Sequence, residues 1–536
     1  MSRFNLKFIV VVFPVFTGMA LLSACVSSKS EPTIKPNLLF IMTDQQRYDA
    51  LSIAGNTVLE TPNLDRLAKQ GAYFKNAYTP CAVCAPARAS ILTGHTVENT
   101  GARTNNQAYD ADEEGLMTMP TFDEILTEEG YHCEYYGKWH SVSSHAEVYK
   151  NPMKVAKNGK SIFDHGGQKY VHLDFLDEEF PIRSLKPGEL YDKMSGRPYV
   201  TDPLDKHHGM TNEELQASNE KYPQCDMHGV LQIPKEYTLT AFQAKQTIEA
   251  IERLKDKPFS ITCSFHFPHA PMLPPEPYYS MYPAADMVPP ASISDDMQNS
   301  PYIKANGRLA NPEYSDTEQI KYMISNYYGL VKEIDDWVGE ILYKLNELGL
   351  AENTLVIFTS DHGEMLGAHG LREKNVFYEE SAHVPLLIRF PNWIKSDAQV
   401  DGYISNIDLF PTIMDYLGIG SQKSDGKSLR GLIDGTDQEH GRYVVTEWDY
   451  RGDISPNYMI VKDGWKLIIP YSVESKVIDA LYNLNEDPYE MNNLLGSNPH
   501  RETHAEKVEE LRTDLMAWLE RTGSGHLEGV ENRGIY

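Results

Sequence analysis

Short apolar runs alternate with helical patterns along most of this 536-residue chain, and this alternation limits the choice of fold more than any other feature. The runs are bounded by turn residues and are too short for helices, so we predict strands at 37–43, 131–136, 260–267, 354–360 and 384–390. Apolar residues at helical spacing between these runs predict helices at 61–71, 121–129 and 320–348. Strands and helices that alternate in this way predict an α/β fold, with a large mixed, mostly parallel sheet sandwiched by helices.

The pattern changes near residue 441, where short strands of alternating polarity begin. We predict strands at 443–447, 458–461 and 465–469, followed by a helix at 503–521. The chain therefore divides into a main domain, 37–440, and a smaller C-terminal antiparallel α+β subdomain, 441–536. Residues 140–235 show no clear period and are rich in Gly, Pro, His and Lys, which fits either insertions around a binding cleft or surface loops.

The N-terminus is typical of a processing segment and not of a folded domain. A positively charged start precedes an apolar stretch, 8–22, which is too short to span a bilayer. Leu22-Ser23-Ala24-Cys25 then resembles a bacterial lipobox. We expect 1–24 to be a lipoprotein-type signal peptide and 25–36 a tether, with Cys25 as the lipid anchor and an ordinary signal peptide as the alternative. These features predict an exported protein in the periplasm or at the cell surface of a Gram-negative bacterium, attached to the membrane only by its lipid.

The chain is strongly acidic, with a formal net charge of −27 at pH 7. Nucleic-acid binding needs a basic face for the phosphates, so this charge argues against a nucleic-acid partner. It also means that an anionic substrate must be attracted by a local basic pocket. Six cysteines occur, of which Cys25 and Cys84 have separate predicted roles. Export permits disulfides among the other four, and the sequence leaves the pairing open for Cys81, Cys133, Cys225 and Cys263.

Cys84 stands at the start of a predicted helix. Pro86 suits a first helical turn and 89–92 continue the helix, so the thiol lies at the positive end of the helix dipole, where an anion is stabilised. Arg88, one turn later, can reach back and hold a tetrahedral oxyanion. This arrangement suits attack on a sulfate or phosphate ester. The alternatives are a buried, inert cysteine and a Cys81-x-x-Cys84 redox or zinc pair, although the chain has no second Cys pair for zinc.

Polar clusters follow three of the predicted strands, at the position where open α/β sheets bind their ligands. The clusters are Asp44-Gln45, the run from Asp361 to Glu364, and the run from His266 to Pro271. Carboxylates, an amide oxygen and an imidazole can together hold one divalent cation beside Cys84. Such a cation would neutralise the oxygens of a sulfate group and lower the pKa of a nucleophilic hydroxyl.

The run 82–94 resembles the signature of the type I, formylglycine-dependent sulfatases: Cys-x-Pro-x-Arg, then an apolar pair, Thr and Gly. The family's pattern continues in segments spread over most of the chain, at 44–49, 61–68, 137–140, 268–271, 360–364, Lys374 and 481–494. Because this family belongs to the alkaline phosphatase superfamily, the resemblance implies an alkaline-phosphatase-like fold. It implies that 37–440 is a sulfatase catalytic domain, of the kind found in bacterial polysaccharide sulfatases.

The resemblance also implies a metal site. Its ligands would be Asp44, Gln45, Asp361 and His362, with Cys84 contributing after its oxidation to formylglycine (3-oxoalanine). Ca²⁺ is the metal that the resemblance favours. Mn²⁺ and Mg²⁺ are alternatives, because Gln and His stand where many sulfatases have Asp and Asn, and an imidazole is a softer donor than a hard cation prefers.

The catalytic residues that the resemblance implies surround this metal site: Cys84, Arg88, Lys138, His140, His269 and Lys374. Arg88 would hold residue 84 and the sulfate, beside the other basic residues. We expect His269, or otherwise Lys374, to protonate the departing alcohol. His140 would then accept the proton from the remaining hydroxyl, so that the aldehyde forms again.

Three functions remain open from the sequence. The first is hydrolysis of sulfate esters on carbohydrate, as oligosaccharides from a sulfated polysaccharide, with a formylglycine-generating maturation enzyme as the partner. The second is phosphonate or phosphate diester hydrolysis, because related hydrolases share the Asp-Gln and Asp-His pairs seen at 44–45 and 361–362. The third is a non-catalytic carbohydrate-binding lipoprotein that has kept the fold.

Overall fold

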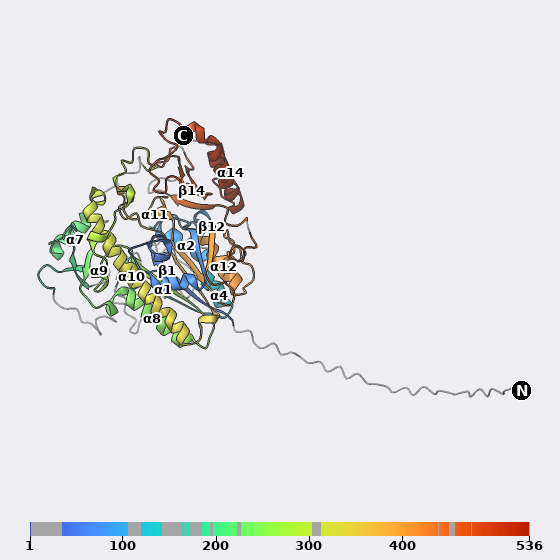
Figure 1. The fold of residues 1–536 in the computed structure, drawn as a ribbon, viewed down its shortest axis with the longest axis horizontal. Helices are drawn as coiled ribbons and strands as arrows, with labels where there is room; N and C mark the ends of the chain where they lie inside the picture. Colours follow the sequence, from blue (N-terminus) through green and yellow to red (C-terminus); the bar gives the residue numbers. More distant parts are fainter. Residues whose placement is uncertain are drawn as a thin grey trace. The chain divides into compact units, whose positions relative to one another are not determined.

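Seven strands form the main sheet, in the order β12 (Ala398–Ser405), β2 (Ala72–Tyr78), β11 (Leu386–Arg389), β10 (Thr354–Ser360), β1 (Asn37–Asp44), β9 (Phe259–Pro268) and β3 (His132–Gly137). β11 is antiparallel to both of its neighbours, whereas all other neighbouring pairs are parallel. This arrangement confirms the predicted mixed, mostly parallel sheet (Figure 1). β2 and β12 were not predicted, because polar residues interrupt both strands and β12 is a half-exposed edge strand.

This structure is a computed structural model, and it describes Met1 and residues 35–105, 119–141, 163–165, 168–170, 185–192, 197–221, 227–302, 312–437, 439–449, 456–472 and 474–534. Lys35–Tyr536 form one unit by their internal contacts. The predicted lipobox with Cys25, nearly all of the predicted signal peptide and tether, and Cys225 lie outside the described residues. These assignments and the boundary at 440/441 stay predictions.

Helices cover both faces of the main sheet. β1 shows this by alternation, because Leu39 and Ile41 join one buried cluster while Leu38, Phe40 and Met42 join another. The first cluster is closed by α1 (Pro62–Lys69), α8 (Leu239–Leu254) and α10 (Thr317–Glu347). The second is closed by α2 (Cys84–Thr93), α4 (Phe122–Glu128) and α12 (Leu409–Tyr416).

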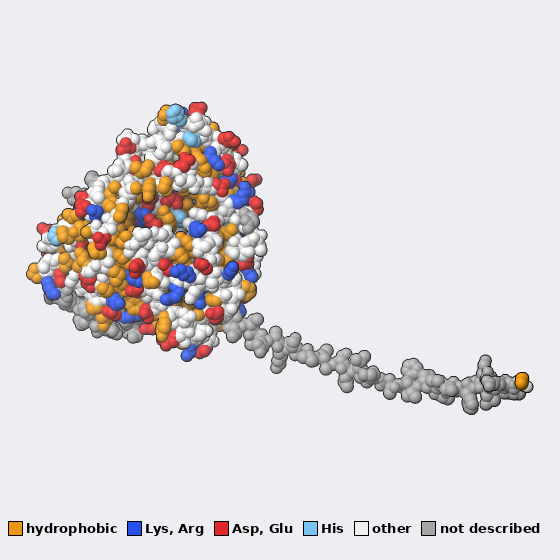
Figure 2. Space-filling model, in the orientation of Figure 1, with side chains coloured by type: hydrophobic (Ala, Val, Ile, Leu, Met, Phe, Trp, Pro, Cys, Tyr) orange, Lys and Arg blue, Asp and Glu red, His pale blue; other side chains and the backbone are white. Residues whose placement is uncertain are grey.

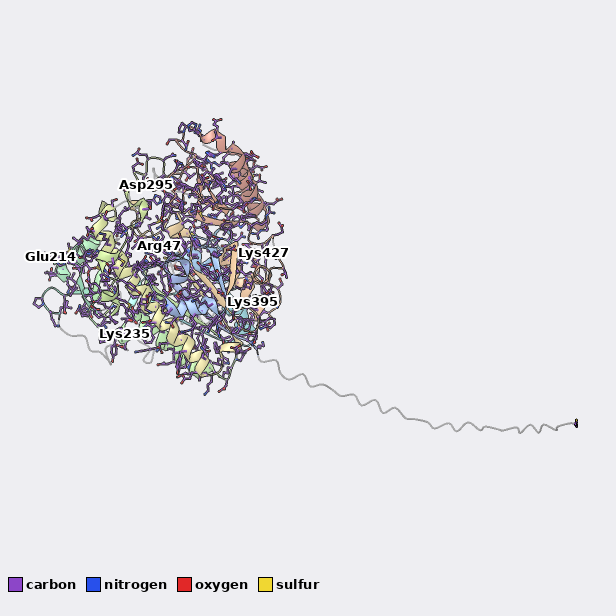
Figure 3. The ribbon with its side chains drawn as sticks, in the orientation of Figure 1. Arg47, Glu214, Lys235, Asp295, Lys395 and Lys427 are labelled. Carbon is purple, nitrogen blue, oxygen red and sulfur yellow. The ribbon has the colours of Figure 1, made fainter. Side chains whose placement is uncertain are left out.

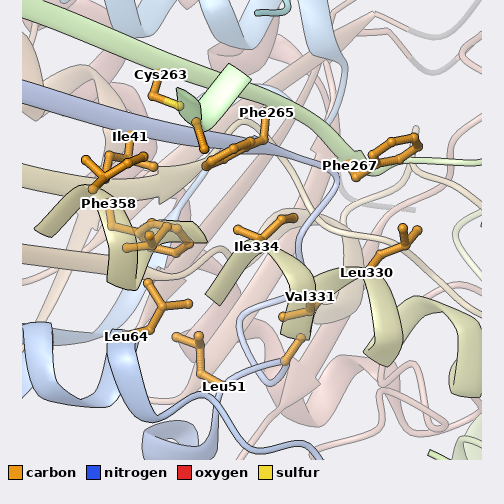
Figure 4. Packing of buried hydrophobic residues seen from close by; sticks show 14 of the residues in the cluster. Ile41, Leu51, Leu64, Cys263, Phe265, Phe267, Leu330, Val331, Ile334 and Phe358 are labelled. Atoms are coloured by element: carbon orange, nitrogen blue, oxygen red, sulfur yellow. The ribbon is translucent and has the colours of Figure 1, made fainter. Parts of the chain in front are cut away.

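The first cluster shows how the long helix α10 is held against the sheet. In Figure 4, Ile334 and Val331 of α10 face Ile41 of β1, Phe358 of β10 and Leu64 of α1. Burial of such side chains contributes about 1.5–3 kcal/mol each. The helices predicted at 61–71, 121–129 and 320–348 are present as α1, α4 and α10, with small differences at their ends.

Residues 185–231 form a second layer of structure beside the loop that follows β9. Their strands are β6 (Leu190–Asp192), β7 (Arg197–Thr201) and β8 (Gly229–Leu231), which make an antiparallel sheet, and α7 (Asn212–Lys221) lies between β7 and β8. The Met272 amide donates to the Met227 carbonyl at 2.7 Å, so this layer is joined directly to the segment after β9. A short hairpin, β4 (Phe163–His165) and β5 (Gln168–Tyr170), precedes it. The described part of 140–235 is thus more regular than the sequence pattern predicts.

The C-terminal part contains an antiparallel sheet, as predicted, with four strands in place of the three predicted. Its strands are β13 (Val444–Asp449), β14 (Pro456–Lys462), β15 (Trp465–Pro470) and β16 (Ala480–Asn483). α14 (Ala505–Thr522) and α15 (Leu527–Asn532) pack on one face of this sheet. The opposite face packs on the main sheet, where Met459 and Ile468 join a cluster with Tyr78 and Phe377 (Figure 1, red and orange).

Short helices complete the described elements: α3 (Val97–Thr100), α9 (Tyr278–Met281), α11 (Glu379–Ala382) and α13 (Arg430–Ile433). On the face seen in Figure 2, acidic and basic side chains lie side by side. In the same view Glu214 of α7 and Lys427 lie on opposite sides, with Arg47 between them (Figure 3). In the part of the chain that the structure describes, every helix is too short or too polar to cross a lipid bilayer.

Candidate active site

Four strands of the main sheet end level with one another and bring their following residues together. Thr43 of β1 is paired with Ser360 of β10, and Asp44 lies opposite Pro268 of β9. Gly137 of β3 is paired with Ser264 of β9. The residues that follow these strands therefore meet at one edge of the sheet, as expected for a parallel arrangement.

Gly137 allows β3 to approach β9 closely at this edge. Its φ of 101° lies in the left-handed region, and a Cβ there would stand 1.9 Å from the carbonyl oxygen of Ser264. Any other residue would collide with the backbone of β9. The Lys138 amide then donates to that same Ser264 carbonyl at 2.9 Å, which fixes the start of the loop.

Cys84 is the first residue of α2, as the sequence predicts. Val83, with an extended backbone (φ −148°), precedes the helix, and every residue of α2 is buried. Cys84 Sγ lies 3.0 Å from His362 Nε2 and 3.9 Å from Asp44 Oδ1. Asp44, Cys84, Asp361 and His362 each offer one ligand atom, and these four atoms all lie within 4.8 Å of one another.

Arg88 reaches this cluster through Asp361. Its Nε donates to Asp361 Oδ2 at 2.7 Å, and both side chains are fully buried. Its Nη1 donates to the Lys138 carbonyl at 2.9 Å and to Ser264 Oγ at 2.8 Å. Nη2 is buried and has no hydrogen-bond partner among the described residues. This guanidinium therefore orients one carboxylate of the cluster and keeps one donor for an oxyanion.

Two buried lysines face the same cluster. Lys138 Nζ forms an ion pair with Asp44 Oδ2. Lys374 Nζ donates to Gln45 Oε1 at 2.5 Å and lies 3.1 Å from His269 Nε2. The predicted residues Gln45, Lys138, His269 and Lys374 are thus brought together around the four-atom cluster.

The charges of these lysines set the acidity of the site. Burial alone would raise the pKa of Cys84, but Lys138, Lys374 and His362 together lower it to about 5. Burial likewise would raise the pKa of Asp44, and Lys138 holds it well below its usual range. A thiol at position 84 is therefore a thiolate at neutral pH, which shows how strongly this place stabilises negative charge.

His269 has the opposite character. Its Nδ1 lies 2.7 Å from the Ala270 carbonyl oxygen, so Nδ1 carries the proton and Nε2 offers a lone pair to Lys374. Burial and the charge of Lys374 hold the pKa of His269 well below its usual range. The ring is neutral at physiological pH.

Two polar residues reach this site without having been assigned a role from the sequence. The Glu364 carboxylate accepts from Gln45 Nε2, and also from the amides of Leu366 at 2.9 Å and Glu373 at 2.6 Å, so it fixes the Gln45 amide. Asn105 Oδ1 accepts from the Ala85 amide at 3.0 Å, directly after Cys84. Glu364 stands inside the run from Asp361 that the sequence singled out, whereas a lone Asn in a loop carries no signal.

His140 and the remaining thiols complete the account of the predicted residues. His140 follows Lys138 by two residues, and its side chain is buried. Its φ is 34°, and its catalytic role stays a prediction. Cys81, Cys133 and Cys263, like Cys84, are free thiols in the described chain. Burial raises the pKa of Cys81 well above its usual value, so the two thiols of the Cys-x-x-Cys spacing have opposite character.

The cluster fits a divalent cation. Two carboxylates, Asp44 and Asp361, balance the charge of such an ion, while Gln45 can add an amide oxygen and His362 an imidazole nitrogen. Oxygen donors dominate this set, as hard cations prefer, and the one imidazole also suits Mn²⁺. The predicted ligands are therefore chemically consistent with one another.

Comparison with known proteins agrees with this reading. The sulfatase family profile matches residues 36–419, and the profile of the N-sulphoglucosamine sulphohydrolase C-terminal region matches residues 367–517. An arylsulfatase of Clostridium perfringens is 29% identical over 505 residues, covering 92% of this chain and 97% of the relative. An N-acetylglucosamine-6-O-sulfatase of Bacteroides thetaiotaomicron is 26% identical over 542 residues, covering 94% and 88%.

A solved structure supports the fold independently. The phosphonate monoester hydrolase of Silicibacter pomeroyi superposes with a TM-score of 0.71 at 22% identity, covering 92% of this chain and 97% of that one. Together the fold and the site define a hydrolase of the alkaline phosphatase superfamily. Within that class, the chain belongs to the sulfatase family, and it is a sulfatase.

Proposed function

We propose that this sulfatase removes sulfate from carbohydrate, as oligosaccharides of a sulfated polysaccharide, using a formylglycine made from Cys84 and a divalent cation, with Ca²⁺ as the first choice. The observation that carries the proposal is the buried cluster of Asp44, Cys84, Asp361 and His362 within 4.8 Å, with basic side chains around it. The sugar is inferred from relatives such as the N-acetylglucosamine-6-O-sulfatase.

A formylglycine at residue 84 would supply a hydrated aldehyde as the nucleophile, and a cation held by Asp44, Gln45, Asp361 and His362 would draw charge from the sulfate oxygens. The chain's own side chains do the rest. Arg88 Nη2 offers a free donor, and Lys138 and Lys374 add positive charge where the sulfate carries its negative charge. Because these side chains are buried, their charges act with little screening by water.

Lys374 is our candidate for the proton donor to the departing alcohol oxygen. His269, which was the first choice from sequence, is neutral and presents an unprotonated Nε2 to Lys374 Nζ at 3.1 Å. It is therefore suited to orient Lys374 rather than to release a proton itself. His140 remains the candidate that would accept the proton of the remaining hydroxyl, so that the C–O bond to the bound sulfate breaks, sulfate leaves and the aldehyde forms again.

This assignment predicts a dependence on the leaving group. Lys374→Ala should reduce kcat strongly for an alkyl or sugar sulfate and much less for 4-nitrophenyl sulfate, whose phenolate leaves without a proton. Equal losses on the two substrates would contradict a proton-donor role and would leave Lys374 as a group that binds sulfate.

The proposal is tested at position 84. Wild-type protein is produced together with a formylglycine-generating enzyme, and peptide mass spectrometry measures the conversion of Cys84 to formylglycine. Cys84→Ala should lose at least about 1000-fold in sulfate release. Cys81→Ala is the matched control, because it removes a buried thiol of high pKa three residues away and should keep nearly full activity. Full activity of Cys84→Ala would overturn the mechanism.

Two other functions are separated by the same protein. The pairs Asp44-Gln45 and Asp361-His362 favour phosphonate or phosphate diester hydrolysis as a second candidate, and the phosphonate monoester hydrolase likeness shows a shared fold. A higher kcat/KM on 4-nitrophenyl phenylphosphonate, a phosphonate monoester, than on 4-nitrophenyl sulfate would support it. Absence of formylglycine and of both activities would support the non-catalytic lipoprotein.

Metabolic labelling with a lipid precursor, compared with Cys25→Ser, tests the proposed anchor and export.

A further inference from the structure

A buried lysine of the C-terminal sheet contacts the segment that carries Lys374. Lys466 lies on β15, and its side chain is fully buried. Its Nζ donates to the Phe377 carbonyl at 2.8 Å and forms ion pairs with Glu379 Oε1 at 2.8 Å and Glu490 Oε1 at 2.7 Å. Phe377 and Glu379 follow Lys374 closely in the chain, so this lysine is bonded to the catalytic segment itself.

The same segment is bonded to the chain that leads to Cys84. Tyr78, the last residue of β2, donates from its hydroxyl to the Glu379 carboxylate at 3.0 Å. The Asn375 amide donates to the Ala82 carbonyl at 3.1 Å. The segment before the nucleophile and the segment with the catalytic lysine therefore form one hydrogen-bonded unit.

The segment that carries Lys374 is also hydrogen-bonded to the segment that carries Asp361 and His362. The Gly363 amide donates to the Ser381 carbonyl at 2.9 Å, and the Glu364 amide donates to the Glu380 carbonyl at 2.8 Å. A Cβ on Gly363 would lie 2.0 Å from the Glu380 carbonyl oxygen, so the two segments are in direct backbone contact. Three parts of the active site thus converge on the stretch that Lys466 holds.

The charges of this cluster are unequal. Burial would raise the pKa of Glu379, but Lys466 and His383 lower it to about 2. Burial raises the pKa of Glu490 to about 7, while its Oε2 accepts from the Glu379 amide at 2.7 Å. Glu379 is therefore the carboxylate whose charge is matched to Lys466, and Glu490 closes the cluster by hydrogen bonds.

We propose that Lys466 is a positioning residue for sulfate ester hydrolysis: it anchors Phe377 and Glu379, and through them it sets the places of Lys374 and Cys84. The C-terminal sheet is then a working part of the active site. This inference rests on the proposed roles of Cys84 and Lys374.

The test measures kcat and KM with 4-nitrophenyl sulfate and with N-acetylglucosamine 6-sulfate on formylglycine-bearing protein of measured metal content. Lys466→Met should lower kcat about tenfold or more on the substrate that wild type cleaves, with a smaller change in KM, because a misplaced group costs transition-state alignment. Lys466→Arg keeps the charge and should recover part of kcat. Lys462→Met is the matched control, since Lys462 of β14 pairs with Glu510 and Asp514 inside the C-terminal part at 2.8 and 2.7 Å and should leave kcat unchanged.

A second variant keeps the test decisive if Lys466→Met does not fold. The double variant Lys466→Met/Glu379→Gln removes the matched positive and negative charges together, so that no low-pKa carboxylate stays buried without its cation, while the introduced amide keeps an oxygen acceptor for Tyr78. A folded double variant with reduced kcat supports the positioning role, and wild-type kcat in either folded variant overturns it. Full activity of Cys84→Ala, or no sulfate release by formylglycine-bearing wild type, would instead overturn the proposed function, so the two failures are distinguishable.

Discussion

Two fully buried clusters of histidine and aspartate lie in this protein, and they differ in what surrounds them. In the active site, Asp361 and His362 are joined by Cys84 and by the cations of Arg88 and Lys138. In the layer beside β9, the carboxylates are paired with imidazoles and no lysine or arginine ion pair to them is among the described contacts.

In this second cluster, which we call the insertion cluster (Asp202, Asp205, His207 and His228), the carboxylates accept hydrogen bonds from within the cluster and, at Asp202, also from Asn326 Nδ2 and the Tyr279 hydroxyl. Asp205 accepts from the His207 amide at 2.6 Å and the His228 amide at 2.7 Å. Asp202 lies 3.0 Å from His228 Nδ1. Among the described residues, only the active-site cluster gathers three or more such ligand atoms within 4.8 Å. The comparison teaches that convergent ligand atoms with lysine and arginine side chains around them mark the chemistry, whereas burial of polar groups alone does not.

A large effect is expected when one of the cations that surround the active-site cluster is removed. Arg88→Met should reduce kcat about 100- to 1000-fold, because a donor aimed at the sulfate oxygens is lost. It should also destabilise the metal-free protein by ~3 kcal/mol, because Asp361 stays buried without its partner. Steady-state rates and thermal melts check both, and kcat within a few fold of wild type would contradict the role of Arg88.

Removal of the metal should affect catalysis through the active-site cluster and should not depend on the insertion cluster. A chelator is expected to abolish sulfate release, and Ca²⁺, Mn²⁺ and Mg²⁺ are then compared for recovery. The insertion cluster should respond differently: Asp205→Ala should lower stability by ~1–3 kcal/mol by leaving buried donors unpaired, with kcat changed less than about threefold. A large loss of kcat in Asp205→Ala would show that this layer takes part in the reaction.

A smaller effect is expected at the helix that carries Cys84. Asn105→Ala removes the acceptor of the Ala85 amide and should reduce kcat about tenfold, with a stability loss of ~1 kcal/mol, similar to the loss of a helix cap. Asn105→Asp keeps an acceptor and is the matched control for stability. Wild-type kcat in Asn105→Ala would remove this residue from the site.

The smallest effect concerns a buried carboxylate of α10 that has no ion-pair partner among the described contacts. Burial raises the pKa of Glu333 to about 8, so the folded protein holds a proton that the unfolded chain releases near pH 4.5. Stability is therefore lost as pH rises from about 4.5 to about 8 and is level above that range. Glu333→Gln should raise the melting temperature by a few degrees more at pH 8.5 than at pH 5. Equal shifts at both pH values would contradict the raised pKa.

Much of this fold follows from local sequence, because buried parallel strands have apolar runs and some helices, such as α4, α8 and α10, have side-chain caps. Thr121 and Glu124, for example, form a capping box at the start of α4. β2 and β12 escape such reasoning, since half of their residues face solvent or a neighbour that is distant in sequence. The residues that meet beside Cys84 could be expected to converge because they follow predicted strands, whereas their roles as metal ligands come from the family resemblance and stay a prediction.

The supporting residues are harder to predict, because their contacts cross long stretches of chain. Glu364 binds Gln45, and Lys466 binds Glu379, yet neither pair is marked by spacing or composition. The proton-donor order also changes with structure, since the pKa of His269 depends on burial and on Lys374 in space. Such roles come from the field of neighbouring charges, which the linear sequence does not contain.

The reversed direction of β11 has a consequence for how the site can vary. Thr359 of β10 lies opposite Leu386 of β11, so residues 361–385 leave the sheet and return to it at adjacent points of the same edge. His362, Glu364, Lys374 and Glu379 all belong to this closed excursion. The pairing fixes its two ends to each other, yet nearly all residues between them are buried and bonded to the chain before Cys84 and to the C-terminal sheet. The excursion is therefore not a unit that can be exchanged alone between relatives; its partners at Ala82 and Lys466 would have to be exchanged with it.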